Sequence, residues 1–138
     1  MKTSLLVFAL LLSVFSALAD SKPKQDPIDA ALDAAIDKDP STAGMINATG
    51  DATAKWDKRM NSAYQSLKKK MAPDEWGALL GAQKAWVNYR DLQIQSIQAT
   101  FSKMDGTMWR PICASEIMDI TKQRALFLES LLETISER

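Results

Sequence analysis

The chain has 138 residues, among them 17 basic residues, 17 acidic residues, one cysteine and no histidine. Histidine is the usual general base and the commonest metal ligand, and a lone thiolate cannot build a metal site, so this composition argues against most enzymes and metalloproteins. The balanced charge, without a concentrated basic stripe, argues against nucleic-acid binding, and we predict a protein that is not an enzyme, needs no cofactor or metal and acts by binding.

The N-terminal segment has the pattern of a cleaved secretory signal peptide, residues 1–19. Lys2 gives a positive start, an apolar run follows, and small residues precede a cleavage point after Ala19. The apolar run is shorter than the ~20 residues that span a bilayer, so a transmembrane anchor is the weaker alternative. We therefore predict export to the periplasm or the medium, with residues 20–138 forming a single domain that is not held to a membrane.

The first predicted helix follows this segment and is short. Asp26 before Pro27 is typical of a helix start, because the acid can cap the helix and proline suits its first position. Ile28 and Leu32 then recur at helical spacing, and Pro40 ends the helix. A second helix is predicted over residues 53–71. Its apolar stripe is formed by Trp56, Met60, Ala63, Leu67 and Met71.

The third predicted helix, residues 73–102, is the longest. Its stripe contains Trp76, Leu80, Gln83, Trp86, Arg90, Ile94, Ile97 and Phe101. Residues 103–110 are predicted to form a loop, and Pro111 begins the last helix. The stripe of that helix contains Cys113, Ile117, Ile120, Arg124, Phe127 with Leu128, and Leu131.

Short links between long amphipathic helices favour antiparallel neighbours. We therefore predict the all-α class: a small antiparallel bundle of about four helices with one long central helix. The lone Cys113 is either buried or forms an intermolecular disulfide, and burial is the favoured interpretation.

Several polar side chains lie on or beside the apolar stripes. A charge that points toward a core is costly unless it is paired, so these groups are expected to meet one another. The predicted central pair is Arg90 with Asp57, because a guanidinium and a carboxylate can bond through two hydrogen bonds. Asn61 and Gln83 would complete the network. Two interpretations stay open: a polar lock that fixes helix register, which we favour, or a ligand pocket.

The same residues carry a family resemblance. Asp57-x-x-Met-Asn61-x-x-Tyr64, then Gln83-Lys-Ala-Trp86 with Tyr-Arg90-Asp91, and finally Thr-x-x-Arg124-x-x-x-Leu, resemble the signature of the LprI-type lysozyme inhibitor domain. The resemblance covers roughly residues 42–132. It implies that the polar network is a family feature, most simply a structural one, made of Asp57, Asn61, Tyr64, Gln83, Trp86, Arg90, Asp91 and Arg124.

The resemblance also implies a function. A protein of this family would bind a peptidoglycan hydrolase, a lysozyme-like muramidase, and block its substrate cleft. Lysozymes are typically basic, so the acidic side chains of the first helix are a candidate partner surface: Asp29, Asp33 and Asp37. Two alternatives remain: an immunity or accessory protein for an exported toxin, and an envelope structural or small-ligand-binding module.

Overall fold

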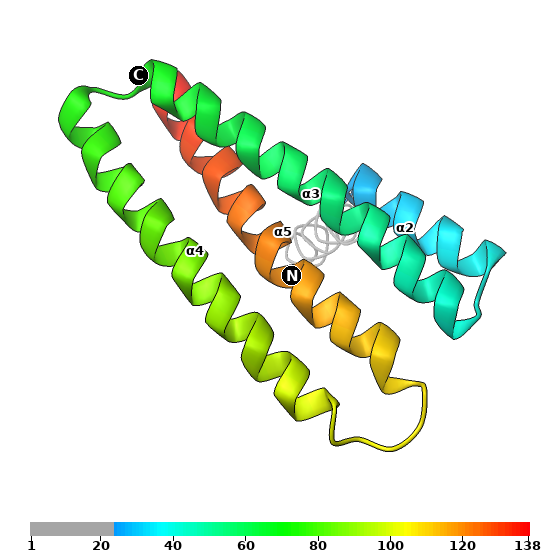
Figure 1. Cartoon of the computed structure of the whole chain (residues 1–138). Coiled ribbons are helices and arrows are strands. Elements are labelled where there is room, and N and C mark those ends of the chain that lie inside the picture. The colour runs from blue at the N-terminus through cyan, green and yellow to red at the C-terminus, as the bar shows by residue number, and fades with distance from the viewer. Residues whose placement is uncertain (1–23) are drawn as a thin grey trace, which may run out of the picture.

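Four helices, each antiparallel to the one before it, form residues 24–138, the part of the chain that the structure, a computed structural model, describes. They are α2 (Pro27–Lys38), α3 (Thr42–Lys70), α4 (Pro73–Phe101) and α5 (Trp109–Ser136) (Figure 1). The predicted all-α class is confirmed. The predicted signal peptide lies outside the described residues. Within them, no helix has the length and apolar character needed to cross a membrane.

The bundle corrects two predicted details. Helix α3 begins at Thr42, well before residue 53, because Ser41 caps it by accepting a hydrogen bond from the Gly44 amide at 3.0 Å. A side chain at Gly44 would collide with Asp39, so glycine is required there by close approach and not by flexibility. The bundle also lacks one dominant central helix, since α3 and α4 have 29 residues each and α5 has 28.

The core lies between α3 and α5, which pack along their length, and α2 covers one side of α3. Trp56 and Leu67 of α3 and Leu128 of α5 are completely buried. Leu128 of the predicted α5 stripe lies in the core, and Leu131 packs against it. The other buried α5 side chains include Met118, Thr121 and Ala125, each one position after a predicted stripe residue. Phe127, which the stripe included, is 53% exposed. Helix α5 turns one apolar face to α3 and another toward α4, and periodicity alone cannot tell which is the deeper.

A polar cluster that the sequence did not reveal joins α2, α3 and α5. The Arg59 guanidinium donates to Asp26 at 2.5 Å and, through two nitrogens, to Glu129 at 2.7 and 2.5 Å. It also lies over the Trp56 ring, 4.5 Å from its centroid. Charge-assisted bonds of this kind are stronger than neutral ones, so the ionic lock of this fold is centred on Arg59.

Asp26 makes the fold sensitive to acid. Burial alone would raise the pKa of its carboxyl, but the hydrogen bonds from Arg59 and from the Ile28 amide outweigh burial and lower the pKa. A carboxyl whose pKa is lowered on folding stabilises the folded protein at any pH above its pKa in the unfolded chain, about 3.9. This stability is lost as the pH falls through the pKa of the carboxyl in the folded protein.

We expect Asp26→Asn to lower the free energy of unfolding by about 1 kcal/mol at neutral pH, because asparagine still caps α2 but cannot pair with Arg59. Below about pH 4 the variant and the wild type should converge as the wild-type carboxylate is protonated. Urea unfolding across this pH range measures both, with the exposed Asp37→Asn of the same helix as control. A constant difference at all pH values would contradict the ion pair.

Candidate functional site

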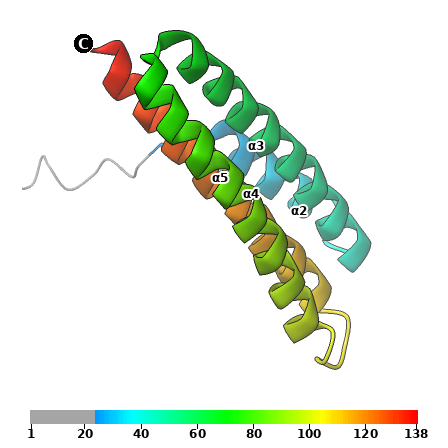
Figure 2. The ribbon, with the colours of Figure 1, turned by 60° about the vertical axis from the view of Figure 1, so that its left-hand side comes forward.

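Helix α4 stands apart from the rest of the bundle. It packs along α5 but makes hardly any contact with α3, and Leu79 is its one buried side chain (Figures 1 and 2). In a closed bundle a second helix would cover the rest of α4, but here that part of α4 is only partly buried. Such a half-covered face beside a neighbouring helix is where a binding cleft can form.

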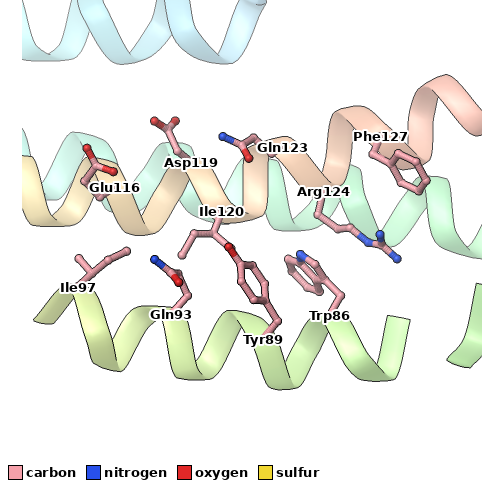
Figure 3. Close-up of a pocket in the computed structure, with 10 residues that line it drawn as sticks. All are labelled: Trp86, Tyr89, Gln93, Ile97, Glu116, Asp119, Ile120, Gln123, Arg124 and Phe127. Carbon is pink, nitrogen blue, oxygen red and sulfur yellow. The ribbon is translucent and has the colours of Figure 1, made fainter. Parts of the chain in front are cut away.

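A cleft of about 390 Å³ opens between α4 and α5 (Figure 3). Its walls mix aromatic rings, amides, acids and aliphatic side chains. They are Trp86, Tyr89, Gln93 and Ile97 of α4, and Glu116, Asp119, Ile120, Gln123, Arg124 and Phe127 of α5. At the lower end of the ~300–1,000 Å³ range of small-molecule sites, it has room for a small group and not for a polymer.

Four of the predicted network residues meet at one end of this cleft. The Arg124 Nε donates to the Gln83 side-chain oxygen at 2.9 Å and joins α5 to α4. The guanidinium carbons of Arg124 and Arg90 lie 5.7 and 5.4 Å from the centroid of the Trp86 ring. Because cations are attracted to the ring face, both arginines interact favourably with Trp86. This cluster of Gln83, Trp86, Arg90 and Arg124 is called the signature cluster below.

The predicted ion pair between Arg90 and Asp57 is wrong. Arg90 donates instead to its neighbour Asp91, at 2.7 and 2.9 Å. Asp57 accepts from Asn61 at 2.9 Å, within α3, and both are exposed. Since α4 packs mainly against α5 and contacts α3 only near its start, Asp57 does not reach Arg90.

Tyr64 does contact α4, but through aromatic packing. Its ring centroid lies 4.9 Å from that of Trp76, where α4 begins. The predicted network is thus divided into a group on α3 and the signature cluster with Asp91.

The cleft also contains residues that the sequence did not single out. Glu116, Asp119 and Gln123 follow one another at intervals of three and four residues, so they share a face of α5. Gln93 lies one turn beyond Tyr89 on α4 and could have been found in the same way. Hydrophilic residues at helical spacing are common on any solvated face, so the pattern alone did not distinguish them.

Arg124 is the member of the signature cluster that has a buried, unpaired donor. Its Nη2 atom is buried and has no hydrogen-bond partner within residues 24–138, and burial lowers the pKa of the guanidinium. An unsatisfied buried donor typically costs about 1–3 kcal/mol. The indole Nε1 of Trp56, in the core, is unpaired in the same way, so the unpaired donor by itself does not decide between the lock and the binding interpretation.

We expect Arg124→Met to raise the free energy of unfolding by about 1 kcal/mol, because methionine fills the same space without an unpaired donor. The matched control is Lys122→Met, two residues away, whose amine pairs with Asp29 at 2.7 Å and lies 5.5 Å from the Trp56 ring centroid. That variant should be destabilised. Chemical denaturation of both variants tests the contrast. A clear loss of stability in Arg124→Met would favour the interpretation in which Arg124 fixes the register of α4 and α5.

Cys113 is half-buried and not buried as favoured from the sequence. It lies near the other end of the α4–α5 pair, beside Trp109 and Met104. Nothing in the described residues pairs with it.

Comparisons with known proteins agree with this description. The model of the family described as "Lysozyme inhibitor LprI" matches residues 33–128. A crystal structure of an uncharacterized protein from Burkholderia thailandensis is similar, with 26% sequence identity and a TM-score of 0.76. The similarity covers 82% of this chain and 57% of that chain, so this chain spans little more than half of that protein. No curated protein matches. Because the family match spans most of the chain and includes every signature residue from Asp57 to Arg124, the chain belongs to the LprI lysozyme inhibitor family.

Proposed function

We propose that the exported protein, residues 20–138, inhibits a lysozyme-like peptidoglycan hydrolase by binding it stoichiometrically and covering its substrate cleft. The observation that carries the proposal is the family match over residues 33–128, which includes the complete signature. A composition without histidine supports binding over hydrolysis, because the chain lacks the commonest general base. The partner is then a protein, and the chain itself is not an enzyme.

The acidic side chains of α2 support a role in attracting a basic enzyme, but one of the three predicted residues has another role. Asp29 is tied to Lys122 at 2.7 Å, so it belongs to the fold more than to a partner surface. Asp33 and Asp37 are exposed, although Asp33 accepts a hydrogen bond from Gln25 at 2.7 Å. Exposed acids of this kind attract a basic enzyme and mainly speed its association, and added salt screens the effect.

Export is part of the proposal. We expect the signal peptide to be cleaved after Ala19, which leaves Asp20 as the first residue of the periplasmic or secreted protein. The measurement is the intact mass of the protein recovered from the exported fraction. A species that retains residues 1–19 would contradict both the cleavage and a freely diffusing inhibitor.

The experiment that tests the partner is complex formation. The exported protein is mixed with an animal-type and with a bacterial muramidase, and the mixtures are analysed by size-exclusion chromatography with light scattering. We expect a complex with the summed mass of one copy of each protein for at least one enzyme. Two unchanged peaks with both enzymes would contradict the proposal.

A small-ligand-binding module is the second candidate, and the cleft between α4 and α5 is the observation that favours it. Tyr89 is 54% exposed there, and a ligand would cover it. A small molecule that stays with the purified protein, seen by native mass spectrometry, together with failure to bind either muramidase, would favour this candidate.

A further inference from the structure

The end of the molecule where α4 turns into α5 carries an unusual surface. Of the nine large apolar side chains exposed in residues 24–138, four lie within this short stretch: Met104 (39%), Met108 (71%), Trp109 (36%) and Ile112 (37%). Residues 101–113 are called the distal end below. Single exposed apolar residues need no explanation, but a contiguous group is typical of a protein-binding surface.

The distal end also has a defined shape. The chain reverses at Gly106, whose φ of 91° suits glycine and few other residues. The rings of Phe101 and Trp109 approach to 6.3 Å between centroids and border a hollow of about 390 Å³. Figures 1 and 2 show this turn projecting past the start of α3 at the end of the α4–α5 pair.

Charge distinguishes the distal end from the acidic helix α2. Lys103 and Arg110 are exposed, and neither pairs with a carboxylate within residues 24–138. Asp105 is the one acid of the distal end, so its net charge is positive. A projecting turn with exposed apolar side chains and unpaired cations is complementary to a cleft that contains carboxylates.

The substrate cleft of a glycan hydrolase is such a site. Most glycoside hydrolases place two Asp or Glu side chains on either side of the bond that they cleave. We propose that the distal end enters this cleft, with Trp109 and Met108 covering its walls and Arg110 facing the carboxylate pair. The inference rests on the proposed function and names the surface that performs it.

The test combines two variants with a competitor. Truncating an aromatic residue at the centre of an interface commonly weakens binding by 2 kcal/mol or more, which is about thirtyfold. Trp109→Ala should therefore raise the concentration needed for half-inhibition of a muramidase by at least about thirtyfold. Arg110→Glu should raise it by at least about tenfold, because it reverses a charge that faces carboxylates.

The control is Leu126→Ala, an apolar residue of α5 that is 41% exposed and lies outside the distal end and the cleft. It should inhibit as the wild type does. Circular dichroism of all three variants shows whether each is folded. If Trp109→Ala unfolds, Met108→Ser takes its place, since Met108 is 71% exposed and makes little contact with the fold.

The competitor is N-acetylglucosamine trimer, which fills the substrate cleft of the muramidase. It should weaken binding of the wild-type protein in proportion to its occupancy. Inhibition that persists in both variants would overturn the role of the distal end while leaving the proposed function intact. Binding unaffected by the trimer would overturn both, because the proposed function has the protein cover the cleft that the trimer fills. A wild-type protein that inhibits neither class of muramidase would overturn the proposed function and this inference with it.

Discussion

Leu128→Ala is expected to lower the free energy of unfolding by about 2–5 kcal/mol, whereas Phe127→Ala, at the adjacent position, should lower it by less than about 1 kcal/mol. Leu128 is fully buried between α5 and α3, and its truncation leaves a cavity that the packed helices can only partly fill. The Phe127 ring is more than half exposed, so water already contacts much of it.

Urea unfolding of the two variants measures this contrast. It is informative because the larger side chain is predicted to matter less, contrary to what hydrophobicity alone suggests. Equal losses would mean that α5 is rotated relative to the structure described above. A larger loss for Phe127→Ala would mean that Phe127, and not Leu128, is the stripe residue that faces the core.

Arg59→Ala is expected to lower the free energy of unfolding by about 2 kcal/mol. The variant removes three charge-assisted hydrogen bonds and leaves the carboxylates of Asp26 and Glu129 without their partner. The side chain of Arg59 is 32% exposed, so the loss should be smaller than the ~3–5 kcal/mol typical of fully buried pairs.

Arg90→Ala is the matched comparison for Arg59→Ala. Arg90 pairs with the adjacent Asp91, whose side chain is 53% exposed, and exposed pairs contribute about 0–1 kcal/mol. Thermal unfolding should therefore show a clear shift for Arg59→Ala and little shift for Arg90→Ala. The reverse order would mean that α4 closes on α3 in solution and that the ion pair predicted from the sequence forms.

The parts of the fold that were predictable depend on local chemistry. Asp26 and Pro27 mark the start of α2, and Pro73 with acids in the first turn marks the start of α4. Both starts lie where they were predicted. The start of α3 was missed because Gly44 and Gly50 disfavour a helix locally, while burial of its first turns against α2 compensates.

The candidate site was predictable only in part, because it depends on which helices are neighbours. The signature identified Gln83, Trp86 and Arg124, and the structure brings these together. It could not show that Asp57 faces away from them. Side-chain spacing shows which residues share a helix face, but not which other helix packs against that face. The bond from Arg59 to Glu129 joins residues 70 positions apart, and no local pattern predicts such a pair.

The most direct test of the account is titration of residues 20–138, the proposed mature protein, into a muramidase that is clearing a cell-wall suspension, at an enzyme concentration above the dissociation constant. Stoichiometric inhibition predicts that the clearing rate falls linearly and reaches its minimum near one equivalent, without consumption of the inhibitor. Full activity at a large molar excess, with both animal-type and bacterial muramidases, would contradict the central claim.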